Sequence, residues 1–294
     1  MWNALFVVIG AVLWATDAIF RHPLSQQISA LTIVYYEHIF ATAIALVWLL
    51  ISDRKRIFLS WKETCGAAFI GIFGSAIATV LFTMSFQLVN PSVTILLQKT
   101  QPMIAIVLAA LFLGEKISAN FLVWAGIAIL SAFLISFPTG IHVQDFYGQE
   151  SLGYLFALLA AVLWATCTVV GKSILKHAPS SALSFWRFAF GLLGTWALAR
   201  RSDQAMIEIP FVPTQPAVLH SLMYIAILPG FLGVSLYYKG LSKIKASRAT
   251  ILELVFPITA VAINAYFLGY PLLPIQMAAA ATLMISMVAI SSLQ

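Results

Sequence analysis

Four charged residues inside long apolar stretches are the residues of this sequence most able to do chemistry: Glu37, Lys99, Arg187 and Glu253. A charge near the centre of a membrane-spanning helix costs about 2.5–3.5 kcal/mol on insertion scales, so each one requires a partner or a watery cavity. Counting residues from the ends of the stretches places Glu37 and Lys99 toward the outer side, and Arg187 and Glu253 toward the inner side. We therefore expect two ion pairs, Glu37 with Lys99 and Arg187 with Glu253. Such pairs either take part in binding and gating or only staple the helices together.

Polar side chains accompany two of these charges. Gln98 and Gln101 share a helical face in one stretch, and Asn264 lies on the corresponding face of another. Pro102 and Pro257 interrupt the same two stretches. A proline frees the carbonyl four residues earlier, which suits a helix that lines a cavity, although packing can also accommodate a kink.

Aromatic residues are further candidates for a binding site, because they could stack on an aromatic substrate or a cation. Trp and Tyr near the ends of spans also form interfacial belts. The candidates are Trp14, Trp164, Tyr36 and Trp186. Asp17 and His22 are interpreted as a solvated helix end, with a proton relay through Asp17 as the alternative. Cys65 and Cys167 have no ligand-like spacing, so neither a disulfide nor a metal site is expected.

Membrane-spanning helices must position these residues. Of the 294 residues, 62% are hydrophobic and 9% are charged, whereas roughly a quarter are charged in a soluble domain. Continuous apolar runs of about twenty residues cross a hydrocarbon core as helices and lack the alternation of barrel strands. We predict ten spans: 2–20, 30–51, 64–87, 92–112, 120–137, 152–171, 181–199, 217–238, 248–267 and 273–292. Small residues at Ala67, Gly71 and Ser75, and at Gly230 and Gly233, predict close contact between helices.

The net charge of +6 is interpreted as a matter of membrane topology and not of nucleic-acid binding. One set of loops holds most of the basic residues: Arg54, Lys55, Arg56, Lys62, Lys116, Lys172, Lys176, Lys239, Lys243, Lys245 and Arg248. The opposite side holds Arg21, Arg200 and Arg201. By the positive-inside rule, both termini are expected in the cytoplasm, in a multi-pass protein of the cytoplasmic (inner) membrane. The first span is expected to be retained, because its flanks do not fit a signal peptide.

The chain repeats itself. The hexapeptide Ala-Val-Leu-Trp-Ala-Thr occurs at residues 11–16 and again at 161–166, so Trp14 plus 150 gives Trp164. In later spans the offset is 155, because Pro102 falls on Pro257. Each half holds five spans, and an odd number makes the second copy start on the opposite side of the membrane, as in inverted-repeat transporters. We predict a first repeat at 1–138, a connecting loop at 139–151 and a second repeat at 152–294. A pseudo-dimer within one chain favours a monomer.

The Leu-Trp-Ala-Thr first helices and the Phe-Leu-Gly-Glu ending at Phe112 to Glu115 resemble the EamA-type branch of the drug/metabolite transporter superfamily. The resemblance extends over essentially the whole chain. It implies a ten-helix fold whose central cavity is lined by the first four helices of each half, and relatives that export or take up amino acids and other small metabolites. Two positions depart from the family pattern: Glu37 stands where members commonly carry Arg, and Tyr270 stands where Glu would end the second copy.

These patterns predict a secondary transporter that works by alternating access on a small metabolite. Internal acids and bases together suit an amino acid or a related zwitterion. The alternative is a multidrug-type exporter of lipophilic organic cations, with Glu37 and the tryptophans as its cation site. The sequence has no Gly-rich Lys-Ser/Thr loop for ATP, and its scattered histidines do not form a catalytic constellation, so an enzyme is not expected. The expected partners are a small-molecule substrate and the lipid bilayer, without cofactor, metal or nucleic acid.

Overall fold

The computed structural model describes residues 2–53, 57–101, 103, 104, 107, 118–139, 148–244, 249, 252, 253 and 255–292. All regular elements in these ranges are helices. Six continuous helical spans in these ranges are long and apolar enough to cross a membrane: Asn3–Ser25, Ala30–Ser52, Trp61–Leu88, Gln149–Ile174, Ser180–Ala199 and Pro216–Leu241. They correspond to six of the predicted spans.

Several of these spans consist of more than one element. In the first part of the chain the elements are α1 (Trp2–Ala15), α2 (Asp17–Ser25), α3 (Ala30–Ser52), α4 (Trp61–Phe69), the π-helical segment η2 (Ile70–Ile77), α5 (Ala78–Leu88), α6 (Pro91–Gln98) and α8 (Ala119–Ser136). In the second part they are α9 (Gln149–Ile174), α10 (Ser180–Ala199), α11 (Asp203–Phe211), the 3₁₀ turn η4 (Val212–Thr214), α12 (Pro216–Ile225), the π-helical segment η5 (Ala226–Gly233), α13 (Val234–Leu241), α15 (Val255–Phe267) and α16 (Pro274–Ser292).

The remaining predicted spans are matched only in part. Shorter apolar helices cover Ala119–Ile135, Val255–Phe267 and Pro274–Ile290, and the span predicted at 92–112 is described mainly through α6. Ten crossings therefore stay a prediction. Several residues used above lie outside the described residues: Arg54, Lys55, Arg56, Pro102, Phe112 to Glu115, Lys116, Lys245 and Arg248. The predicted connection at 139–151 also lies largely outside them.

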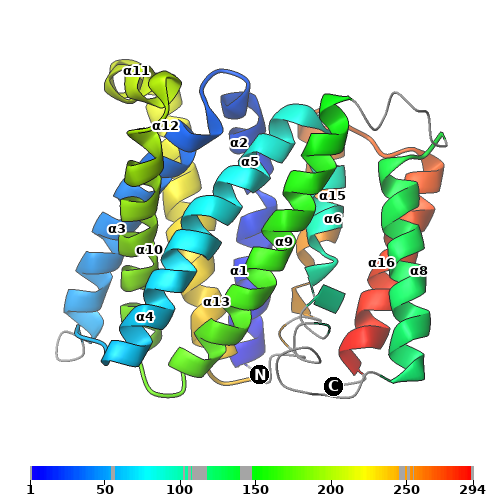
Figure 1. Cartoon of the computed structure of the whole chain (residues 1–294), viewed down its shortest axis with the longest axis horizontal. Helices are drawn as coiled ribbons and strands as arrows, with labels where there is room; N and C mark the ends of the chain where they lie inside the picture. Colours follow the sequence, from blue (N-terminus) through cyan, green and yellow to red (C-terminus); the bar gives the residue numbers. More distant parts are fainter. Residues whose placement is uncertain are drawn as a thin grey trace.

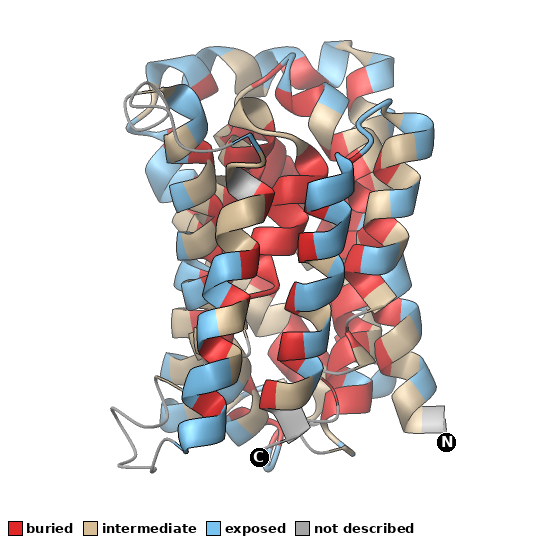
Figure 2. Ribbon diagram, turned by 90° about the vertical axis from the view of Figure 1, so that its right-hand side faces the viewer, coloured by how far each residue is buried: buried red, intermediate tan, exposed pale blue. Residues whose placement is uncertain are grey.

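The helices form one bundle in which the start of α1 and the end of α16 lie at the same end (Figure 1). Helix α3 packs against α10 within the bundle, while α8 and α16 pack together along one edge. Buried residues gather on the faces that point inward, and exposed residues cover the outside (Figure 2). Much of that outer surface is apolar, for example Leu122, Ile129 and Ile285, each more than half exposed. A bilayer would cover such a surface at no cost, because lipid tails are themselves apolar.

The two π-helical segments join the two parts of the chain. Helix α1 packs against η5 and α13, and α9 packs against η2 and α5. The Trp164 Nε1–H group donates a 2.7 Å hydrogen bond to the carbonyl of Gly74 in η2. Trp14 lies directly over Gly233 at the end of η5, where an added Cβ would stand 2.8 Å from Trp14 Nε1. π-Helical turns inside α-helices are frequent at functional sites.

The small-residue prediction is confirmed for Gly71, which allows η2 to approach α10. A Cβ at Gly71 would lie 2.5 Å from Phe190 Cβ and 2.7 Å from the carbonyl oxygen of Arg187. Ser75, one turn later, is more than a spacer, because its Oγ accepts a 2.6 Å hydrogen bond from Arg187 Nε. The small residues of η2 therefore allow close packing against α10 and also supply a hydrogen-bond acceptor for Arg187.

The connection at 200–216 contains α11, which is fixed to the start of α3 by Glu208. The Glu208 carboxylate accepts hydrogen bonds from Ser29 N at 2.9 Å, Ser29 Oγ at 2.6 Å and Thr32 Oγ1 at 2.7 Å. Partial burial acts to raise the pKa of Glu208, but these bonds and one from Gln204 outweigh it and hold the pKa below its ordinary value. The charged carboxylate also suits a helix N-terminus.

Candidate substrate-binding site

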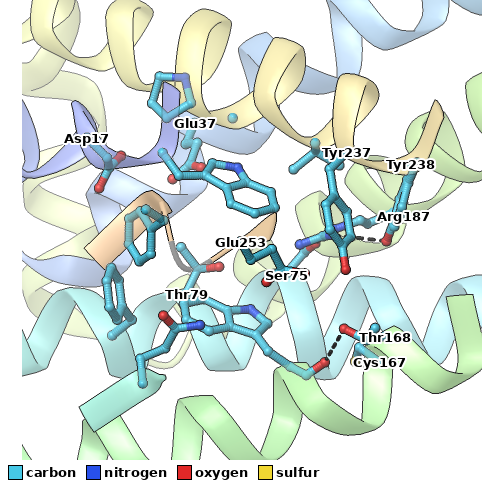
Figure 3. Close-up of a pocket in the computed structure, with 18 of the residues that line it drawn as sticks. Asp17, Glu37, Ser75, Thr79, Cys167, Thr168, Arg187, Tyr237, Tyr238 and Glu253 are labelled. Atoms are coloured by element: carbon cyan, nitrogen blue, oxygen red, sulfur yellow. Dashed lines mark hydrogen bonds between the residues drawn. The ribbon is translucent and has the colours of Figure 1, made fainter. Parts of the chain in front are cut away.

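A cavity that is partly open to solvent lies among helices from both parts of the chain. Helices α1, α2, α3 and α6 and the η2–α5 segment line it from the first part, and α9, α10 and the η5–α13 segment line it from the second. Pockets for small molecules are mostly apolar with a few placed polar groups. Figure 3 shows side chains of both kinds converging on this cavity.

Two aromatic pairs form part of the cavity wall. Trp14 of α1 packs on Tyr237 of α13 with ring centroids 5.1 Å apart. Trp164 of α9 packs on Phe82 of α5, also with centroids 5.1 Å apart. All four residues line the cavity. Each pair thus joins one ring from the first part of the chain to one ring from the second.

A buried cluster of two carboxylates and one guanidinium lies on α2 and α3. Asp17 accepts two hydrogen bonds from Arg21, at 2.5 Å from Nε and 2.9 Å from Nη2. Glu37 accepts one 2.8 Å bond from Arg21 Nη2, and Thr83 Oγ1 accepts from Nη1 at 3.1 Å. Asp17, Arg21 and Glu37 are 8%, 3% and 6% exposed. The cluster therefore holds one more carboxylate than cation in a buried site.

A second ion pair connects the two parts of the chain across the cavity. Lys99 Nζ lies 3.4 Å from Glu253 Oε2 and 4.7 Å from the centroid of the Phe256 ring. Lys99 follows α6 directly, where the chain leaves the helix. Tyr237 also lies against Glu253. The Lys99–Glu253 pair carries no net charge and lies on the cavity wall.

Arg187 is the cavity cation that has no carboxylate partner within the described part of the chain. Its Nε donates to Ser75 Oγ and its Nη1 donates to Tyr238 Oη at 2.9 Å. The guanidinium also lies 5.7 Å from the centroid of the Tyr238 ring. In Figure 3, Arg187 and Tyr238 lie on one side of the cavity, and Asp17 and Glu37 lie on the other. The excess positive charge of Arg187 and the excess negative charge of Asp17 and Glu37 thus lie on opposite sides of the cavity.

Two residues that line the cavity have a polar atom without a hydrogen-bond partner among the described residues: Gln98 at Oε1 and His38 at Nε2, the latter packed against Gly191 of α10. Gln98 is 7% exposed, and its Nε2 donates to Gln101 Oε1 at 2.9 Å. His38 is 1% exposed, and its Nδ1 lies 2.7 Å from the Val34 carbonyl. Unpartnered buried polar atoms are costly, so a molecule or water bound in the cavity would stabilise Gln98 Oε1.

The structure brings together most of the residues predicted for the site. The predicted residues that line the cavity are Trp14, Glu37, Gln98, Lys99, Gln101, Trp164, Arg187 and Glu253. The predicted pairing is wrong, because Glu37 pairs with Arg21 and Lys99 pairs with Glu253. The pairing was predicted from the expected depth of each charge in the membrane alone. That depth does not determine the direction in which a side chain points around its helix.

Three predicted residues lie elsewhere. Tyr36 donates from Oη to the carbonyl of Ile209, and Trp186 donates from Nε1 to the carbonyl of Ile57. Asn264 is fully buried and donates to Ser92 Oγ. Tyr36 and Trp186 point away from the cavity because each directly precedes a charged residue that faces it, and neighbouring residues on a helix do not share a face.

Sequence reasoning missed several lining residues, above all Asp17 and Arg21. Asp17 was interpreted as a solvated helix end and Arg21 as part of a loop, but α2 continues the first span through Ser25 and buries both. Their spacing of four residues is the signal that could have identified an ion pair on one helical face. The hydroxyls of Thr79 and Tyr238 also line the cavity, and they carried no comparable signal.

The sequence pattern of the EamA-like transporter family matches residues 1–137 and 151–292. The chain belongs to the EamA-like transporter family. As a member of this family it is a membrane transporter and not an enzyme, which confirms both predictions. Its substrate is a small molecule, and its surroundings are the lipid bilayer.

Individual relatives of this EamA-like transporter cover most of its length. It is 30% identical over 99% of the chain to the riboflavin transporter ImpX of Fusobacterium nucleatum subsp. nucleatum, covering 98% of that protein. It is 25% identical to a transporter of Archaeoglobus fulgidus, with 79% of each chain covered. A solved crystal structure matches 99% of the chain with a TM-score of 0.68 at 15% identity, covering 96% of that structure. That likeness concerns the fold. The relatives give no support to the amino-acid substrate predicted from the sequence.

Proposed function

We propose that this transporter carries a planar heteroaromatic metabolite of the riboflavin class across the cytoplasmic membrane. The observation that carries the proposal is the pair of matched aromatic contacts, Trp14 with Tyr237 and Trp164 with Phe82, in one cavity. Flat rings stack on such side chains, and each aromatic contact contributes about 0.5–1.5 kcal/mol beyond its buried area. The similarity to a riboflavin transporter over nearly the whole chain points to the same class.

Polar groups at the cavity wall suit the edges of such a ligand. Arg187 and Tyr238 can donate to ring carbonyls, and Gln98 Oε1 can accept from a hydroxyl or a ring N–H group. An arginine presents its donors in a fixed planar fork, which matches a planar ligand with two acceptors. The ring system would then stack on the aromatic pairs while its polar edge faces Arg187.

Alternating access within an inverted repeat is part of the same proposal, with one repeat at 1–138 and the other at 152–294. The register of the later spans supports it, because Phe82 plus 155 gives Tyr237. Trp14 plus 150 gives Trp164, so the two aromatic contacts are related by the sequence repeat. The repeat would place the site between two halves that rock against each other. A monomer with both termini in the cytoplasm completes this arrangement.

A zwitterion such as an amino acid is a second candidate. The observation that favours it is the separation of charge in the cavity, with excess carboxylate at Asp17 and Glu37 and an unbalanced Arg187. An ammonium group could face the carboxylates while a carboxylate faces Arg187. The aromatic pairs have no role in that arrangement, so we favour the heteroaromatic ligand.

Binding and exchange measurements on the purified transporter test the proposal. Riboflavin fluorescence should be quenched on binding, and labelled riboflavin should exchange into proteoliposomes that are preloaded with unlabelled riboflavin. Amino acids and a lipophilic cation serve as competitors. Trp14→Ala and Trp164→Ala should each weaken binding about tenfold, since 1.4 kcal/mol changes affinity tenfold. Trp196→Ala is the matched control, because Trp196 is 47% exposed and packs on Arg200 outside the cavity. Exchange of amino acids or of the cation without any response to riboflavin would refute the proposal.

A further inference from the structure

The cluster of Asp17, Arg21 and Glu37 is more than a structural ion pair. It contains two carboxylates and a single guanidinium, all at most 8% exposed. Burying an unbalanced charge in a membrane protein is costly, and one bound proton would make the cluster neutral. The two carboxylates are joined through one guanidinium, because Arg21 Nη2 donates to both of them.

The bonding within the cluster leaves room for that proton. Asp17 is held by two bonds from Arg21, whereas Glu37 accepts through Oε2 only, as far as the described residues show. Its second oxygen, Oε1, faces Gly230 of η5, where an added Cβ would lie 3.5 Å away. Glu37 and Gly230 both line the cavity. A proton arriving from the cavity therefore reaches the cluster without crossing the helices.

The elements packed around the cluster supply little competing charge. Helix α5 contributes the Thr83 hydroxyl, and α12 contributes Tyr224, whose hydroxyl donates to Thr16. His38, next to Glu37 on α3, turns its ring toward Phe188 of α10. The other charged residues of the cavity do not bond to the cluster: Arg187 bonds to Ser75 and Tyr238, and Lys99 and Glu253 pair with each other.

We propose that the Asp17–Arg21–Glu37 cluster is a proton-binding site that couples substrate movement to the proton gradient. Uptake of one proton at Glu37 Oε1 forms a carboxyl O–H group, and the bond from Arg21 Nη2 to Oε2 loses its charge assistance, which weakens it. That change loosens α3 from α2 at the cavity wall. Because the cluster lines the same cavity as the aromatic pairs, the proton and the substrate influence each other's binding. The inference rests on the proposed transport of a riboflavin-class substrate.

Proteoliposomes separate this inference from the proposed function. Exchange of labelled riboflavin without any gradient tests transport alone. An imposed gradient of one pH unit then tests coupling, since one proton per substrate supports about tenfold accumulation. Absence of exchange would refute the proposed function, whereas exchange without gradient-driven accumulation would refute the coupling.

Neutral variants test the assignment of the cluster. In Asp17→Asn and in Glu37→Gln, gradient-driven accumulation divided by exchange should fall about tenfold, to the value without a gradient. Asp53→Asn and Glu208→Gln are matched controls, because these acids bond Ser181 and Ser29 away from the cavity. The pH dependence of riboflavin binding in detergent is a second readout that does not require transport. It should be present in the wild type and flat in both cluster variants, and a pH dependence that persists in both would overturn the assignment.

Discussion

Replacing Gly71 by alanine should separate η2 from α10 and release Arg187 from Ser75. The new Cβ would stand 2.5 Å from Phe190 Cβ and 2.7 Å from the Arg187 carbonyl oxygen. Carbon atoms in contact lie about 3.5–4.0 Å apart, so α10 must retreat by about 1 Å. The 2.6 Å bond between Arg187 Nε and Ser75 Oγ would then lengthen to about 3.6 Å, which is no longer a hydrogen bond.

The expected cost has a packing part and a polar part. Overpacking of a tight contact costs about 1–3 kcal/mol, and the lost hydrogen bond adds about 0.5–1.5 kcal/mol. Thermal unfolding in detergent should therefore show a lower melting temperature for Gly71→Ala. Ser75→Ala removes the hydrogen bond alone and should fall between this variant and the wild type.

Gly126→Ala is the control for this prediction. Gly126 lies in α8, where an added Cβ meets nothing within 4 Å, so the substitution should leave the melting temperature unchanged or raise it slightly. The reasoning fails if Gly71→Ala melts with the wild type, or if Gly126→Ala loses as much stability as Gly71→Ala.

Three further predictions follow from individual contacts. The pKa of Glu208 is lowered in the folded protein, so its carboxylate stabilises the fold fully above its ordinary pKa and loses that effect as the pH falls through the folded pKa. The difference in stability between the wild type and Glu208→Gln should therefore shrink toward zero on acidification. A difference that stays constant with pH would contradict this. Lys99→Met leaves Glu253 unpaired, so the double variant Lys99→Met/Glu253→Gln should be more stable than Lys99→Met alone. A double-mutant cycle should give a coupling energy of about 0.5–3 kcal/mol. If the stability losses of the two single variants simply add, the ion pair contributes nothing to stability. Trp164→Phe removes the hydrogen bond to Gly74 and should cost about 1 kcal/mol of stability while retaining more riboflavin quenching than Trp164→Ala, and equal quenching in both variants would exclude stacking on this ring.

The sequence was sufficient for the helical membrane fold and for most of the charged lining, because a charge in an apolar run stands out by its energetic cost. It was insufficient for the pairing. Residue counting predicts the same depth for Glu37 and Lys99, but the rotation of each helix about its axis decides which charges meet. Arg21 of α2 meets Glu37 of α3 instead. That rotation depends on packing, which single-sequence periodicity does not resolve.

Adjacent residues illustrate what the sequence could have shown. Tyr36 and Glu37 cannot both face the cavity, and the same holds for Trp186 and Arg187, because consecutive helical residues diverge. Choosing the charged member of each pair would have excluded both misplaced aromatics. The π-helical segments η2 and η5 carry no sequence signal of this kind, so the contact between Trp164 and Gly74 was not predictable.

The two buried ion clusters differ in when they can form during synthesis. Arg21 and Glu37 are 16 residues apart, whereas Lys99 and Glu253 are separated by 154. A ribosome adds about 5–20 residues per second, so Lys99 waits about 8–30 s in the nascent chain before its partner exists. The first cluster can therefore close inside a newly inserted hairpin. The second requires nearly the whole chain, which makes Lys99 a residue whose burial reports the completion of assembly.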